Sequence, residues 1–235
     1  MEETLCKIIY SNFMNLTRQS LFFLVCILGQ FQYLSAQVPD KENTMVVEVK
    51  STTGRIWMDR NLGASEVAKS SLQSSSFGYL YQWGRFSDGH QLRRSRTTKK
   101  LSSKSSPGNS AFILSTKSPN DWIKVQNDQL WQGAKGINNP CPVGFRLPTS
   151  NEFDEEIATW ISKDARGAIL SALKLPLSGY RSNGDGEVTD SGISGDYWSS
   201  TVEDKNARGL YFDTKSGGTD IGGRAVGVSV RCIKN

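Results

Sequence analysis

The sequence predicts an α+β fold with short antiparallel strands, one clear amphipathic helix and long loops. Short runs of β-branched and aromatic residues alternate with glycine-rich turns, which is typical of short strands. One segment, beginning at Thr149, has the apolar period of a helix. The chain has 235 residues, of which 37% are hydrophobic and 22% charged, so it can bury one substantial core. This composition excludes disorder over the whole length, a collagen-like repeat and a polytopic membrane protein.

The N-terminal segment has the layout of a secretory signal peptide. Residues 21–28 form an apolar run that follows Arg18 and precedes a polar stretch ending at Ala36. This run is too short to span a bilayer. We therefore expect an exported protein, located outside the cell, on its surface or in the periplasm, with Met14 as an alternative start. The expected division is a signal peptide at 1–36, a short linker at 37–44 and a domain at 45–235.

The first predicted elements of the domain are a hairpin and an aromatic segment between loops. Residues 45–49 and 55–59 are β-branched and aromatic runs on either side of a Thr-Thr-Gly turn, the pattern of a hairpin. Residues 65–76 and 91–110 are serine-rich and without periodicity, which predicts surface loops. Between these loops, the aromatic-rich residues 77–85 are expected to pack as their anchor.

The predicted helix begins with a capping box, because Glu152 follows Thr149 at the required spacing. Its apolar face is formed at i, i+4, i+7 and i+8 by Phe153, Ile157, Trp160 and Ile161. The helix dipole favours anions in the first turns. We therefore interpret the acidic residues there as helix electrostatics and not as a catalytic pair; they are Asp154, Glu155 and Glu156.

A short apolar stretch at 168–173 follows, and the chain then returns to strands. The predicted strands are 175–180, 197–201, 209–213 and 225–233. In the last one, apolar residues alternate with glycine and polar residues, so one face is expected to be apolar and to carry Cys232.

Two cysteines remain after removal of residues 1–36, and they are Cys141 and Cys232. In an oxidising compartment such a pair is most simply a disulfide, with a reactive thiol pair as the alternative. The bond would close a loop of about 90 residues, which the chain-entropy model values at about 4 to 5 kcal/mol.

Several motifs follow one another along the domain. They are residues 57–64 (WMDRNLGA), 78–85 (GYLYQWGR), 88–90 (DGH), 139–149 (NPCPVGFRLPT), 175–181 (LPLSGYR), 197–201 (YWSST) and 229–234 (SVRCIK). In this order they resemble the Fibrobacter succinogenes major paralogous domain family, over nearly all of residues 45–235. The resemblance implies a bacterial exported or surface protein and kinship with the C-type-lectin-like fold.

The expected ligand face combines glycine-rich loops at 182–194 and 216–224 with neighbouring strand residues, because recognition usually lies on loops held by a rigid sheet. The candidate ligand-binding residues are Asp196, Tyr197, Trp198, Arg208, Asp220 and Arg224.

Large aromatic residues in a domain with few aliphatic runs are expected to form its core. This expectation covers four of the six tryptophans, Trp57, Trp83, Trp160 and Trp198. The other two, Trp122 and Trp131, lie in less regular sequence and are more open to a surface role.

The positive charge of the chain is concentrated in one segment. The formal net charge is +5, from 28 Lys and Arg against 23 Asp and Glu. Seven basic residues and no acidic one lie between Asp88 and Asp121, so the rest of the chain sums to 5 − 7 = −2. We expect a solvated, mobile loop, and the alternative is contact with anionic envelope polymer or lipid headgroups, not with nucleic acid. The residues for that contact are Arg93, Arg94, Arg96, Lys99, Lys100 and Lys104.

The residues needed for catalysis or metal binding are scarce. His90, the one histidine, borders a polar loop where nothing in the sequence orients it, and no G-x-S-x-G motif exists. A zinc site lacks ligands. Asn183, Asp185, Glu187 and Asp190 resemble a calcium loop, but Val188 stands where an EF-hand loop has glycine. We expect no enzyme activity and no cofactor, with calcium as a minor alternative.

The sequence thus predicts an exported, non-catalytic binding module whose ligand is a glycan, an envelope polymer or a protein surface. Three alternatives stay open. They are a structural adhesin or envelope component, a retroelement-diversified receptor, and an enzyme related to the formylglycine-generating enzymes, whose copper-binding cysteine pair has no counterpart here. The oligomeric state is left open.

Overall fold

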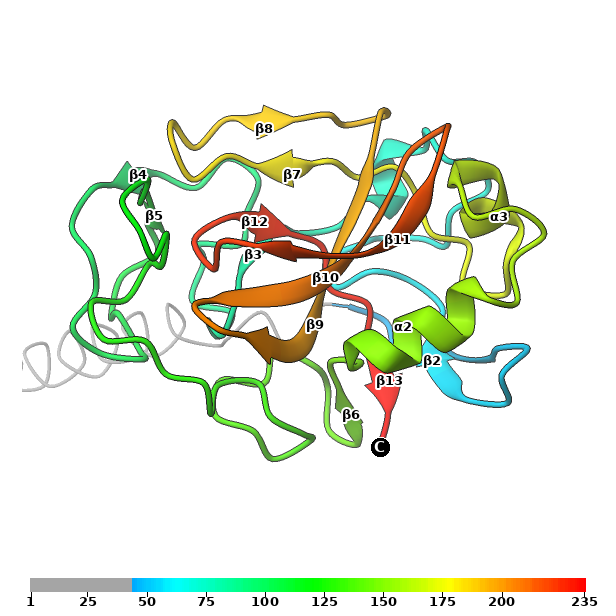
Figure 1. The fold of residues 1–235 in the computed structure, drawn as a ribbon, viewed down its shortest axis with the longest axis horizontal. Helices are drawn as coiled ribbons and strands as arrows, with labels where there is room; N and C mark the ends of the chain where they lie inside the picture. Colours follow the sequence, from blue (N-terminus) through cyan, green and yellow to red (C-terminus); the bar gives the residue numbers. More distant parts are fainter. Residues whose placement is uncertain (1–43) are drawn as a thin grey trace, which may run out of the picture. The chain divides into compact units, whose positions relative to one another are not determined.

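Figure 1 shows the fold in a computed structural model that describes residues 44–235. The predicted signal peptide, and the linker before Thr44, lie outside the described residues. Within them the fold is mixed and mostly strand, so the predicted α+β class is confirmed. The helices are α2 (Ser150–Ile157), α3 (Ala165–Leu170) and the short 3₁₀ helix η2 (Ser74–Ser76). The strands are β1 (Glu48–Lys50), β2 (Ile56–Met58), β3 (Tyr81–Gln82), β4 (Thr97–Thr98), β5 (Phe112–Ile113), β6 (Phe145–Arg146), β7 (Tyr180–Arg181), β8 (Val188–Thr189), β9 (Gly195–Glu203), β10 (Asn206–Phe212), β11 (Gly217–Gly222), β12 (Gly227–Val228) and β13 (Ile233–Lys234).

The strands form four small sheets. Three of them are antiparallel, with the orders β1-β2-β13-β6, β11-β10-β9 and β3-β12-β7-β8. The fourth is the parallel pair of β4 and β5. The predicted hairpin is confirmed, because β1 pairs with β2 and Val49 stands opposite Trp57. Its turn closes with a hydrogen bond from Gly54 N to Ser51 O of 2.9 Å.

Helix α2 forms where the sequence predicts it and covers one face of the β9–β10–β11 sheet (Figure 1). The capping box is present: Thr149 Oγ1 accepts from Glu152 N at 3.2 Å, and Glu152 Oε2 accepts from Thr149 N at 2.8 Å. The helix ends at Ile157, so the predicted apolar face stops short of Ile161, which is 68% exposed. Beneath the helix, one core cluster joins Phe153, Ile157, Leu210 and Phe212 with neighbouring apolar residues.

The end of the chain differs from the prediction of one strand at 225–233. The segment divides into β12, which pairs with β3 and β7, and β13, which pairs with β2 and β6. Because it passes from one sheet to another, both of its faces are buried, including Ser229 and Arg231. The expectation of a single apolar face is therefore wrong. The strand predicted at 175–180 includes only Tyr180 of β7, and 217–222, predicted as loop, forms β11.

The tryptophans lie in the core, and this corrects the surface role considered for Trp122 and Trp131. Both are fully buried, with Trp122 Nε1 donating to Trp83 O at 2.7 Å and Trp131 Nε1 donating to Asn138 O at 2.8 Å. They share a core cluster with the disulfide of Cys141 and Cys232, which is confirmed. This bond joins the loop before β6 to the residue before β13, across 91 positions of sequence, with the Cα atoms 5.9 Å apart.

Buried arginines hold the long loops to the sheets. Arg181 donates to the carbonyl oxygens of Leu92, Ser95 and Gly186, and its guanidinium lies 4.3 Å from the ring centroid of Phe112. A planar guanidinium has five donors, so one side chain can satisfy several backbone carbonyls outside regular strands. The segment 91–110 is therefore tied to the sheet at its beginning, in contrast to the free loop that its composition predicts.

Candidate functional site

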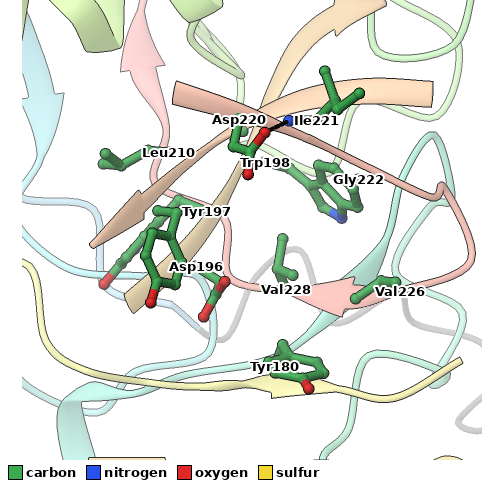
Figure 2. A pocket seen from close by; sticks show the side chains of 12 residues that line it. Tyr180, Asp196, Tyr197, Trp198, Leu210, Asp220, Ile221, Gly222, Val226 and Val228 are labelled. Carbon is green, nitrogen blue, oxygen red and sulfur yellow. Dashed lines mark hydrogen bonds between the residues drawn. The ribbon is translucent and has the colours of Figure 1, made fainter. Parts of the chain in front are cut away.

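A hollow of about 220 Å³ opens on the face of the β9–β10–β11 sheet that is turned away from α2 (Figure 2). Its lining comes from β7, β9, β10, β11 and the segment around β12, which are brought together only in the folded chain. The residues that line it are Tyr180, Asp196, Tyr197, Trp198, Gly209, Leu210, Tyr211, Asp220, Ile221, Gly222, Val226 and Val228.

The strand register decides which side chains share this face. Asp196 stands opposite Tyr211, and Trp198 stands opposite Gly209, which in turn stands opposite Asp220. Directly opposed residues in an antiparallel sheet project to the same side, and alternate residues of one strand do so too. The three strands therefore present Asp196, Trp198, Tyr211 and Asp220 together.

Glycines leave the floor of the hollow open. A Cβ atom on Gly209 would lie 2.6 Å from the carbonyl oxygen of Tyr197, and one on Gly222 would lie 3.1 Å from the ring of Trp198. The indole of Trp198 is buried and its Nε1 donates to Tyr81 O at 2.8 Å. Trp198 is thus a fixed floor to the hollow and part of the core at the same time.

Asp196 is a partly buried carboxylate in the hollow. Ser194 Oγ donates to Asp196 Oδ2 at 2.6 Å, and burial raises the pKa of Asp196 to about 6. The neighbouring carboxylate of Asp190 adds to this increase, while the bond from Ser194 opposes it. Since the lining includes no lysine, arginine or histidine, the hollow has negative charge and no cation of its own.

Two tyrosines border the hollow with their hydroxyls protonated. Burial raises the pKa of Tyr211 to about 12, and the Tyr211 hydroxyl donates to Asp213 Oδ2 at 2.9 Å. Burial also raises the pKa of Tyr180, with further contributions from Asp190 and Asp196. Tyr180 comes from β7 and lies across the hollow from Asp220 (Figure 2). Tyr211 precedes Phe212 in a predicted strand, and this alternation is a sequence signal that the two side chains face opposite sides of the sheet. The sequence has no such signal for the position of Tyr180.

Four of the predicted ligand residues line the hollow, namely Asp196, Tyr197, Trp198 and Asp220. The ring of Tyr197 stacks on Phe212 and its hydroxyl donates to Pro176 O, so this side chain belongs to the core.

The structure does not bring the two predicted arginines to the hollow. Arg208 pairs with Glu203 and donates to Thr219, whose own hydroxyl donates to Asp154 of α2, so it lies on the helix side of the sheet. Arg224 is 1% exposed and lies 4.6 Å from the ring centroid of Trp83, with its Nη2 donating to Asp128 at 2.6 Å. Neither can meet a ligand in the hollow without rearrangement of the core or the sheet.

The basic segment separates into anchored and exposed residues. Arg93 donates to Gly78 O at 2.9 Å and to Ser178 O at 2.8 Å. It is therefore anchored, although the composition of its segment predicts a mobile loop. A second hollow, of about 580 Å³, is lined by arginines together with two carboxylates; the charged lining residues are Arg93, Arg94, Arg96, Arg181, Asp185 and Glu187. Three exposed lysines do not line it, and they are Lys99, Lys100 and Lys104.

His90 is fixed by the fold, which corrects the expectation that nothing orients it. It is fully buried, its Nε2 accepts from Gln82 N at 3.1 Å, and its Nδ1 donates to Asp88 Oδ1 at 2.8 Å. Burial, with the nearby charge of Arg85, lowers the pKa of His90 to about 4. The imidazole is thus neutral, and both of its nitrogens serve the packing of the loop after β3.

Residues 44–235 contain neither a metal-binding cluster nor a membrane-spanning helix. No group of three or more His, Cys, Asp or Glu side chains there is arranged to hold a metal ion, and Asp185 Oδ1 of the calcium-like loop accepts from Glu187 N at 3.0 Å. No helix in the same range has the length and apolarity to cross a bilayer.

Comparison of the chain with protein-family models, curated proteins and solved structures finds no match.

Proposed function

We propose that this protein is an exported, non-catalytic binding module of the C-type-lectin-like superfamily, and that the hollow on the β9–β10–β11 sheet is its ligand site. The observation that carries the proposal is Asp196, a carboxylate kept in a partly buried, aromatic-walled hollow although burial disfavours its charge. Strained or unfavourable electrostatics in a concave site are typical of binding and catalytic positions. The disulfide and the resemblance of the motifs support export and kinship.

The ligand class that fits these walls best is a glycan. The rings of Tyr180 and Tyr211 offer apolar surfaces for a sugar ring, while their hydroxyls and the carboxylates offer hydrogen bonds. The volume of about 220 Å³ is below the range of about 300 to 1,000 Å³ typical of sites for drug-sized ligands. The site therefore accommodates a single sugar unit, with the rest of a chain extending outside.

A glycan array with the purified protein tests this proposal. Tyr211→Ala removes a wall residue and is expected to lower affinity at least tenfold. Arg208→Ala is the matched control, because it removes a large side chain from the same strand on the opposite side of the sheet. Trp198→Ala is a poor test, since the indole is also core. Unchanged glycan binding in Tyr211→Ala would exclude the hollow as the ligand site. The absence of any glycan binding would favour a structural adhesin.

A second candidate is contact with an anionic surface through the arginine-lined hollow. Arg93 and Arg181 are already bonded to backbone carbonyls, so the exposed Arg94 and Arg96 are the residues that can reach outward. We expect Arg94→Glu with Arg96→Glu to reduce binding to vesicles containing anionic lipid, and Lys117→Glu, outside that lining, to have a smaller effect. Equal losses of vesicle binding in the two variants would show that binding depends only on total positive charge and not on the arginine-lined hollow.

A further inference from the structure

We propose that the hollow recognises a saccharide unit carrying a free amino group, with its ammonium bound by Asp196 and its ring held between Tyr180 and Tyr211. This inference rests on the proposed function, since it names the ligand class of the same site. It follows from the charge of the hollow, the unused oxygen of Asp196 and the aromatic walls.

The hollow is negative and has no internal counter-charge. Asp196 and Asp220 both line it, and none of its lining residues is a cation. Asp190 lies close enough to contribute to the electrostatics of Asp196 and of both tyrosines. A ligand with an anionic group would add to this charge, whereas an ammonium compensates it.

Two other carboxylates that are at least partly buried have an arginine partner, whereas Glu156 of α2 is buried without one. Asp88 accepts from Arg85 at 2.8 Å, and Glu152 accepts from Arg146 at 2.8 Å. Buried charges are generally paired in this way, because an unpaired one loses its hydration without compensation. Asp196 forms no ion pair with a described residue and faces a hollow, so its cation can come from outside.

One oxygen of Asp196 is available for that contact. Oδ2 accepts the hydrogen bond from Ser194, which also holds the carboxyl group in place. Among the described residues, no hydrogen bond is formed to Oδ1, and Asp196 lines the hollow. A charge-assisted bond from an ammonium to a positioned carboxylate is about twice as strong as a bond between neutral groups.

The aromatic walls add a second attraction for the same cation. Tyr211 stands directly opposite Asp196 in the sheet, so an ammonium on Asp196 lies beside this ring. Cations near aromatic faces are attracted by the ring quadrupole, an interaction that this fold already uses between Arg181 and Phe112. Asp220, whose Oδ1 accepts from Ile221 N at 2.7 Å, is placed to accept from sugar hydroxyls across the hollow. A sugar ring can use both the aromatic walls and a carboxylate that accepts from its hydroxyls. The alkyl chain of a lysine has no hydroxyls, so it fits this hollow less well.

Matched pairs of probes test the inference by calorimetry with the full protein. The first pair is glucosamine and N-acetylglucosamine oligomers of equal length, which differ in the charge of the amino group. We expect the free amine form to bind at least tenfold more tightly. Asp196→Asn should bring the two affinities within about threefold of each other, and Arg208→Ala should leave the difference unchanged. Folding of the variants is checked by circular dichroism, and Tyr180→Ala serves as a second site variant.

The outcomes separate this inference from the proposed function. Equal or preferred binding of the N-acetylated form, still sensitive to Tyr211→Ala, overturns the amino-sugar assignment and leaves the glycan module standing. Binding of neither form, nor of any other glycan, overturns both. A second probe pair, a lysine peptide and its acetylated form, completes the design: binding of the lysine peptide alone, dependent on Asp196, overturns the saccharide and identifies a protein ligand.

Discussion

The pKa and the ion pairing of a carboxyl group in this protein depend on the residues that surround it. Glu156, predicted as a helix-dipole charge, is 1% exposed, and neither of its carboxyl oxygens has a hydrogen bond. Burial raises the pKa of Glu156, and the nearby hydroxyls of Ser51 and Thr53 offset this only in part. Its neighbour Glu155 projects outward to Arg55. One position along the helix thus separates a surface ion pair from a buried acid.

Glu156→Gln should stabilise the protein at neutral pH by about 1 kcal/mol. The folded pKa is higher than the unfolded one, so the stability linked to this group is present below pH 4.5 and is lost as the pH rises through the folded pKa. Chemical denaturation at pH 4 and pH 7 should show a gain only at the higher pH. Glu155→Gln is the control, and an equal effect of pH on the two variants contradicts the assignment.

Asp196→Asn should stabilise the free protein while removing the preference for the free amine form of the ligand. The pKa of Asp196 rises from 3.8 to about 6, mainly through burial and also through Asp190, so its stability contribution is lost between about pH 4 and pH 6. The gain at pH 7 is at most about 3 kcal/mol, from about 1.4 kcal/mol per pKa unit. Thermal unfolding measures it. A residue retained for structure would show the reverse, a loss of stability with binding intact.

Elements formed by local contacts are those that the sequence predicts best. The capping box of α2 needs only Thr149 and Glu152, three residues apart, and it forms as expected. Strand β11 was missed because its residues, GGTDIG, have low strand propensity. It exists because β10 provides a complete antiparallel partner from Ala207 to Phe212. One of its glycines, Gly222, then lines the candidate hollow and leaves it unfilled.

Gly209→Ala should destabilise the protein by about 1 to 3 kcal/mol, because the added Cβ would meet the carbonyl oxygen of Tyr197 at 2.6 Å. Gly218→Ala is a matched control in the same sheet, since its Cβ would meet nothing within 4 Å. We expect this second variant to be neutral or slightly stabilising, as alanine restricts the unfolded chain. Urea denaturation of both variants measures the difference, and similar midpoints would contradict the close approach at Gly209.

The whole described domain is held by long-range connections between short elements. Strands of two or three residues form few ladder bonds, so the buried arginines and the disulfide connect loops that no sheet includes. Arg231, for example, is 1% exposed and donates to Leu173 O at 2.6 Å and to Asn61 Oδ1 at 2.8 Å. Such contacts join positions far apart in the chain.

Replacing Cys141 and Cys232 with serine should lower the free energy of unfolding by about 4 to 5 kcal/mol in the chain-entropy model. The bond spans 91 positions, which makes the unfolded loop long. Denaturation with and without reductant measures the effect. Reduced wild type should behave like the double variant, which should itself be insensitive to reductant. Labelling of both thiols in the native protein would contradict the bond.

The sequence by itself determined the fold class, the hairpin, the capped helix, the cysteine pair and the region of the candidate site around residues 196–198. These depend on contacts between near neighbours, or on a pairing with a single solution. Only the tertiary structure decided that Arg208 and Arg224 lie outside the candidate site. It also decided that Tyr180 and Tyr211 line this site and that His90 is held by hydrogen bonds. The reason is physical: the face to which a strand residue points is set by register with distant strands, and a one-residue change in register reverses it.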